Sequence, residues 1–147
     1  MHGYPVLLVE DDPNDVLLIQ RAFRNARMAN PIHVVEDGEL AISYLSGSGE
    51  YSERERFPLP VLVFLDLKLP RKSGLEVLNW IRAQRSLKRL PVVVLTSSRE
   101  NHDINRAYEA EANSYLVKPG AFEDLLELVK TLKIYWMIMS ELPDLSG

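Results

Sequence analysis

The chain has 147 residues, 46% of them hydrophobic and 26% charged, with a formal net charge of −4 and no cysteine. These values fit one globular domain and exclude a fibrous or disordered protein, a disulfide framework and a cysteine nucleophile. Neither a dense basic run, a signal peptide nor an apolar stretch of membrane-spanning length occurs, so we expect a cytoplasmic protein that binds neither nucleic acid nor membranes.

Five short apolar segments occur along the chain and are separated by helical patterns. They cover residues 5–9, 31–35, 61–65, 91–95 and 114–117. The stretches VLLV, VLVFL and VVVL are apolar at every position, whereas a strand with one face in water would alternate apolar and polar residues. We therefore predict strands that are covered on both faces.

Each apolar segment is followed by a pattern typical of a helix. Asp12 and Pro13 form a helix start, because aspartate caps free N–H groups and proline suits the first helical position. Gly74 is interpreted as no more than a helix-start residue. Further helices are expected after Gly38, after Gly74, from Asn101 or His102, and over about 121–139.

Two polar regions are interpreted as solvent-exposed. The connection over 46–60 is rich in glycine, serine and charged residues, which predicts a mobile surface loop. The basic residues Arg82, Arg85, Lys88 and Arg89 are interpreted as the solvated end of a helix.

The alternation of strands and helices predicts a parallel sheet with right-handed crossovers. We expect a doubly wound α/β fold of five strands in the flavodoxin-like order 2-1-3-4-5. One domain would cover residues 1–147, with a core over about 4–130 and a C-terminal helix extension over about 131–143. In such sheets the functional site lies beyond the carboxyl ends of the strands, between the first and third.

Polar residues of particular kinds stand at these strand ends. An acidic run at residues 10–12 follows the first strand, and Asp66, Thr96 and Lys118 end the third, fourth and fifth. Clustered carboxylates repel one another unless a cation lies among them, and Mg²⁺ binds carboxylate, water and phosphate oxygens. An aspartate beside such an ion can act as a nucleophile and form an acyl phosphate. Taken singly, the acidic run could be a helix cap, Thr96 structural and Lys118 a solvated turn lysine.

The motifs at the strand ends resemble those of a known family. LLVEDD, LDLKLP with Gly74 following, VVLTSS and YLVKP occur in this order over nearly the whole chain. At these residues the chain resembles the receiver domains of two-component response regulators. The segments LKRLPVVVLTSS and IYWMIMSELP are similar, more narrowly, to response regulators paired with cyanobacterial phytochromes, which implies a light-regulated kinase as partner.

The resemblance implies roles for individual residues. Asp66 would be phosphorylated by a sensor histidine kinase, and Mg²⁺, or Mn²⁺ in its place, would be bound by Asp11, Asp66 and the backbone carbonyl of Lys68. Glu10 would act on the ion through water, and Asp12 would be a cap or an accessory acid.

Further roles concern the last two strands. Thr96 and Tyr115 match the family's switch pair, and Lys118 matches its phosphate-binding lysine. The resemblance also implies a cis peptide bond between Lys118 and Pro119.

The C-terminal helix carries more apolar surface than docking onto a sheet requires. Tryptophan, tyrosine and methionine are enriched at protein interfaces, and symmetric pairs are the commonest oligomers. We therefore expect a homodimer, unless these side chains fold back on their own chain or the helix end frays. The additional apolar residues are Leu128, Leu132, Tyr135, Trp136, Ile138 and Met139.

Other functions stay open at this point. A haloacid-dehalogenase-like phosphatase also uses an aspartate nucleophile, but it carries a second aspartate two residues later, where this chain has Lys68. A pseudo-receiver adaptor would bind partners without phosphorylation, although the retained Asp11, Asp66, Thr96 and Lys118 argue against it. A flavodoxin would need a serine- and threonine-rich loop after the first strand. We expect a phosphoacceptor signalling protein that assists its own phosphorylation and dephosphorylation, not an enzyme.

Overall fold

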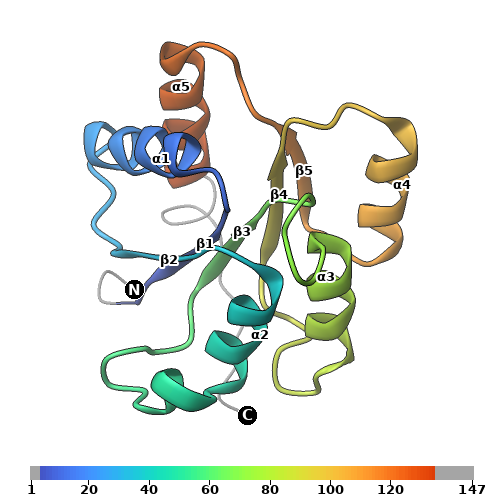
Figure 1. Cartoon of the computed structure of the whole chain (residues 1–147). Coiled ribbons are helices and arrows are strands. Elements are labelled where there is room, and N and C mark those ends of the chain that lie inside the picture. The colour runs from blue at the N-terminus through green and yellow to red at the C-terminus, as the bar shows by residue number, and fades with distance from the viewer. Residues whose placement is uncertain (1–3, 135–147) are drawn as a thin grey trace.

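The computed structural model describes residues 4–134 and contains a five-stranded parallel sheet with helices on both faces (Figure 1). The strands are β1 (Val6–Val9), β2 (Ile32–Val35), β3 (Leu62–Leu65), β4 (Val92–Thr96) and β5 (Ser114–Val117). The helices are α1 (Pro13–Asn25), α2 (Gly38–Ser46), α3 (Gly74–Ala83), α4 (Asn101–Glu109) and α5 (Phe122–Leu132), with a short 3₁₀ turn η1 (Gly49–Ser52). The strand order β2-β1-β3-β4-β5 confirms the predicted fold.

The central strands are buried on both faces, as their apolar sequences predicted. Along β1, Val6 and Leu8 pack with α1 and α5, whereas Leu7 and Val9 pack on the opposite side with α2 and α3. This alternation is the two-residue period of a strand, and both faces need apolar side chains because helices cover both. Among the described residues, no helix is long and apolar enough to cross a membrane.

The register of the sheet aligns the strand ends that carry polar residues. Val9 pairs with both Val35 and Leu65, so β1, β2 and β3 end at the same level. The backbone N–H of Asp66 donates to the carbonyl of Val9 at 3.1 Å, which extends the pairing by one residue. The residues after β1 and β3 therefore emerge side by side.

The connection between α2 and β3 was expected to be mobile, but the structure packs it against α2. Tyr51 and Phe57 from this segment contact the buried ring of Tyr44, with ring centroids 5.1 and 6.0 Å from it. Arg54 donates to the carbonyls of Tyr44 and Leu45 at 2.7 and 2.8 Å. The guanidinium thus binds carbonyls in the last turn of α2, where a positive charge is favourable. These contacts could not be predicted from the glycine and charge content of the connection.

The interpretation of the basic group as a solvated helix end is wrong for Arg82. Its guanidinium donates to the carbonyls of Glu111, Lys88 and Leu90 and to the side chain of Asn113, at 2.7–3.0 Å. Arg82 therefore joins the end of α3 to the turns before β4 and β5. The other three basic residues, Arg85, Lys88 and Arg89, are exposed.

Candidate functional site

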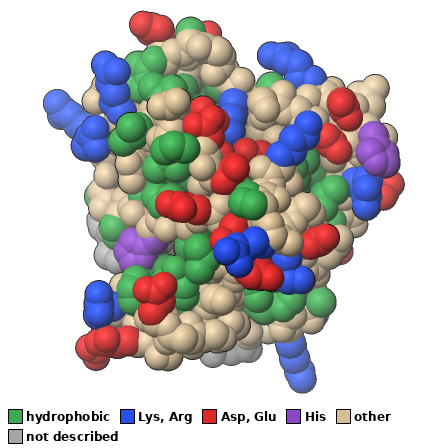
Figure 2. Space-filling view, viewed as in Figure 1, with side chains coloured by type: hydrophobic (Ala, Val, Ile, Leu, Met, Phe, Trp, Pro, Cys, Tyr) green, Lys and Arg blue, Asp and Glu red, His purple; other side chains and the backbone are tan. Residues whose placement is uncertain are grey.

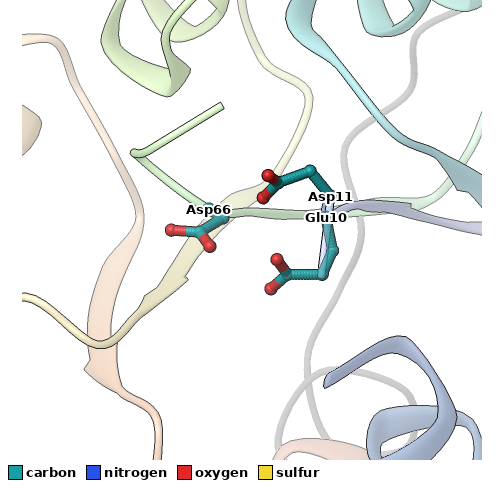
Figure 3. A group of neighbouring side chains, drawn as sticks. All are labelled: Glu10, Asp11 and Asp66. Atoms are coloured by element: carbon teal, nitrogen blue, oxygen red, sulfur yellow. The ribbon is translucent and has the colours of Figure 1, made fainter. Parts of the chain in front are cut away.

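Acidic side chains gather near the middle of the face shown in Figure 2. Among the described residues, the carboxylates of Glu10, Asp11 and Asp66 come together, with ligand oxygens within 4.8 Å of one another (Figure 3). Glu10 and Asp66 are buried, and Asp11 is exposed. The group forms because β1 and β3 end at the same level. Such a set of oxygen ligands fits a hard divalent cation, which would offset the mutual repulsion of the carboxylates.

Lys118 reaches this group from the end of β5. Its backbone N–H donates to the carbonyl of Thr96 at 2.8 Å, which continues the pairing between β4 and β5. Its ammonium donates to Asp15 at 2.8 Å, to Asp66 at 3.0 Å and to Glu10. An ammonium group has three N–H donors. Carboxylates that follow β1 and β3, together with one on α1, therefore occupy all the donors of Lys118.

Burial and pairing shift the pKa values of this group in opposite senses. Burial raises the pKa of the Glu10 carboxyl to about 7, and the hydrogen bond from Lys118 opposes that increase. Burial lowers the pKa of the Lys118 ammonium, but the hydrogen bonds to Asp15 and Glu10 and the charge of Asp66 outweigh it. The net pKa of Lys118 is raised, so this residue stays cationic at neutral pH.

Two acidic residues near the start of α1 differ in their roles. Asp12 accepts a hydrogen bond from the backbone N–H of Asn14 at 2.9 Å, so it is the predicted helix cap. Asp15 binds Lys118 and was missed as a site residue. The sequence did place Asp15 in the first turn of a helix that begins at the site. Its contact with Lys118 could not be predicted, because that contact depends on how far the lysine side chain extends.

Gly74 has a tighter role than the helix start that the sequence indicated. A Cβ atom at this position would lie 2.2 Å from the carbonyl oxygen of Asp66 and 2.6 Å from the Cα of Leu67. The backbone N–H of Gly74 donates to the carbonyl of Leu67 at 2.8 Å. The start of α3 therefore lies directly against the backbone that carries Asp66, and only glycine leaves room for that approach.

Thr96 and Tyr115 are connected through Ser98. Thr96 is fully buried at the end of β4, and its hydroxyl oxygen lies 3.5 Å from the backbone nitrogen of Ser98. The hydroxyl of Tyr115 donates to the carbonyl of Ser98 at 2.9 Å. The Ser98 hydroxyl donates in turn to Asp103 on α4 at 2.6 Å. A displacement of Thr96 would therefore alter the contacts that Ser98 makes with Tyr115 and with α4.

The expectation of a cis bond before Pro119 is wrong, since the described residues contain no cis peptide bond. The trans form is the favoured one for a bond to proline, by about 0.5–1 kcal/mol. Lys118 binds the acidic group from this ordinary backbone conformation.

The backbone N–H of Lys68 donates to Asp66 at 3.3 Å, while the side chain of Lys68 is exposed.

The residues expected at a dimer interface divide into two sets. Leu128 and Leu132 are half-buried and pack in part against the apolar cluster of their own chain, beside α1. Tyr135, Trp136, Ile138 and Met139 lie outside the described residues. The homodimer stays a prediction.

The chain matches the family model of the response regulator receiver domain over residues 6–130. It is 42% identical to the probable methanogenesis regulatory protein FilR2 of Methanothrix harundinacea, over 90% of this chain and 83% of that protein. It is 38% identical to the response regulator Rcp1 of Synechocystis sp., over 94% of this chain and 92% of that protein.

Solved structures of response regulators are similar to this chain both in sequence and in fold. The phosphorylated cyanobacterial phytochrome response regulator RcpA is 37% identical, with a TM-score of 0.89, over 97% of this chain and 99% of that chain. The Mn²⁺-bound form of Rcp1 is also 37% identical, with a TM-score of 0.86, over 97% of this chain and 100% of that chain. The similarity thus covers the sheet, the helices and the strand ends together.

The close approach of Gly74 to the Asp66 backbone makes a direct prediction about stability. Gly74→Ala should lower the free energy of unfolding by about 1–3 kcal/mol, because the added methyl group overlaps a carbonyl that cannot move away. The matched control Gly120→Ala should change it by less than about 0.5 kcal/mol, since no atom lies near that position. Urea unfolding measures both values. A Gly74→Ala protein as stable as the wild type would contradict this account of the approach.

Proposed function

This chain belongs to the response regulator receiver domain family, and on that premise we propose that Asp66 accepts a phosphoryl group from a sensor histidine kinase. The observation that carries the proposal is the setting of Asp66 at the end of the central strand β3. Its carboxylate lies beside Glu10 and Asp11 and 3.0 Å from the Lys118 ammonium. A nucleophile, a set of cation ligands and a fixed positive charge thus occupy one site.

The transfer is a displacement at phosphorus. A carboxylate oxygen of Asp66 attacks the phosphorus of the kinase's phosphohistidine and forms a P–O bond. The P–N bond breaks, and its electron pair stays on the imidazole nitrogen of the departing histidine. The product is an aspartyl phosphate. Positioning and charge neutralisation supply most of the catalysis in such transfers, so the protein assists its own phosphorylation and the later hydrolysis.

The acidic residues fit the ligands of a divalent ion. We propose that Asp11, Asp66 and the backbone carbonyl of Lys68 hold Mg²⁺, or Mn²⁺ in its place, with Glu10 acting through water. When bound, the ion neutralises charge on the phosphoryl oxygens. The Mn²⁺-bound form of the similar protein Rcp1 supports this assignment. The alternative of a dehalogenase-like phosphatase has no such support, because its general acid would stand at Lys68.

Lys118 and Thr96 are proposed to bind the transferred group, and Tyr115 to report its arrival. The Lys118 ammonium would contact one phosphoryl oxygen and the Thr96 hydroxyl another. The link from Thr96 through Ser98 to the Tyr115 hydroxyl supports a switch that changes the surface formed by α4 and β5.

The partners and the organisation of the chain are proposals of the same kind. We propose a phytochrome-type histidine kinase upstream, because RcpA is a cyanobacterial phytochrome response regulator. We also propose that the chain is a single cytoplasmic receiver domain, residues 1–147. It would pair as a homodimer through the extension over about 131–143 and bind neither nucleic acid nor membranes.

Phosphorylation of Asp66 is tested with acetyl phosphate and Mg²⁺ by intact-mass measurement. The wild-type chain should gain one phosphoryl group, and Asp66→Asn should gain none because it lacks the nucleophile. Chelation of Mg²⁺ should abolish labelling of the wild type, since the ion that offsets repulsion between the acidic group and the phosphodonor would be missing. The control Asp12→Asn should keep its label, because Asp12 caps a helix. Labelling of Asp66→Asn at the wild-type rate would refute the assignment.

If Thr96 and Tyr115 form the switch, a substitution at Thr96 should separate phosphorylation from the structural change that follows it. Thr96→Ala should still be phosphorylated, but the amide NMR signals of Ser98 and Tyr115 should no longer shift on phosphorylation, because the buried hydroxyl that binds the phosphoryl group is missing. The control Ser97→Ala alters an exposed neighbour and should respond as the wild type does. A wild-type shift in phosphorylated Thr96→Ala would exclude this route.

A further inference from the structure

Lys118 has no free donor in the state that the structure describes. Its ammonium donates to Glu10, Asp15 and Asp66, and these contacts use all of its N–H groups. A phosphoryl oxygen can therefore be bound by Lys118 only if one carboxylate gives up its hydrogen bond. The hydrogen bond between Lys118 and the carboxylate that is released is therefore the contact that opposes phosphorylation.

The burial of the three carboxylates differs. The exposed fraction of the side chain is 1% for Glu10, 10% for Asp66 and 33% for Asp15. A buried carboxylate that loses its partner is strongly destabilised, whereas water can replace the partner of an exposed one. Glu10 therefore keeps its contact, and Asp66 carries the phosphoryl group itself. Asp15 is the partner that costs least to release.

The position of Asp15 makes its release easy in a second way. Asp15 lies in the first turn of α1, which Asp12 caps. The partial positive charge at the N-terminal end of a helix stabilises negative charge there. The carboxylate of Asp15 thus remains stabilised after Lys118 has left it.

We propose that Asp15 is a positioning residue that holds Lys118 in the unphosphorylated protein and releases it when the phosphoryl group arrives. This inference rests on the proposed phosphorylation of Asp66. Asp15 then opposes phosphorylation, because its contact with Lys118 must be given up on the way to the product. It leaves hydrolysis unaffected, because Lys118 is already bound to the phosphoryl group in the phosphorylated state.

The test measures the two rates separately in the whole chain with Mg²⁺ and acetyl phosphate. In this reaction an Asp66 oxygen attacks phosphorus, the P–O bond to acetate breaks, and acetate leaves with the electron pair. Asp15→Asn should be labelled about two- to five-fold faster than the wild type, the range expected for loss of a partly exposed ion pair. After removal of acetyl phosphate, its label should decay at the wild-type rate. Asp15→Ser, which also removes the negative charge, should behave in the same way.

Two controls separate this role from a general effect of charge. Glu36→Gln removes one negative charge from an exposed residue that lines a surface hollow with Glu10 and Asp11. It should accelerate labelling less than Asp15→Asn does. In a Lys118→Met background, Asp15→Asn should change the rate by less than about 1.5-fold, because effects that act through one partner are not additive.

The outcomes distinguish this inference from the proposed function. A wild-type chain that gains no label would overturn both. If the wild type is labelled but Asp15→Asn is labelled at the same rate or more slowly, only the role of Asp15 is wrong. An equal acceleration by Glu36→Gln, or a full effect of Asp15→Asn without Lys118, would also overturn that role.

Discussion

The ammonium group of Lys118, held among carboxylates from three elements, is the interaction on which the site depends. It joins Glu10 after β1, Asp15 on α1 and Asp66 after β3. Without this cation, buried carboxylates at adjacent strand ends would repel one another or take up protons. The carboxylates still outnumber the ammonium, so the site retains the negative charge that attracts a divalent ion. The arrangement is thus poised to admit a metal ion and a phosphoryl group together.

The parallel sheet supplies the geometry that makes this interaction possible. Because β1 and β3 end at the same level and β5 continues beside β4, the acidic residues and Lys118 arrive from separate parts of the chain at one edge. Gly74 then lets α3 lie against the backbone of Asp66. Rigid strands fix the reacting residue, while the segment from Thr96 to Ser98 and the side chain of Tyr115 can transmit a change.

Much of this architecture could be predicted from the sequence, because it depends on local patterns. Wholly apolar strands indicated helices on both faces, and polar residues at the strand ends indicated the site. The missed features depend on how far a side chain reaches or on how closely two backbones approach. Arg54 binds carbonyls at the end of α2, and Arg82 binds carbonyls of the turns before β4 and β5. Asp15 contacts a lysine more than a hundred residues away, and Gly74 matters because of its approach to Asp66. Composition near each of these residues resembles that of an ordinary surface.

Asp66 is the proposed carrier of the phosphoryl group, and reduction of the phosphorylated chain with borohydride directly identifies the residue that carries it. Borohydride converts an aspartyl phosphate to homoserine, and peptide mass spectrometry then locates the homoserine in the chain. We expect homoserine at position 66 alone, since Asp66 is the carboxylate at the end of the central strand that also contacts Lys118. Homoserine at position 11 or 15, with Asp66 unmodified, would contradict the account.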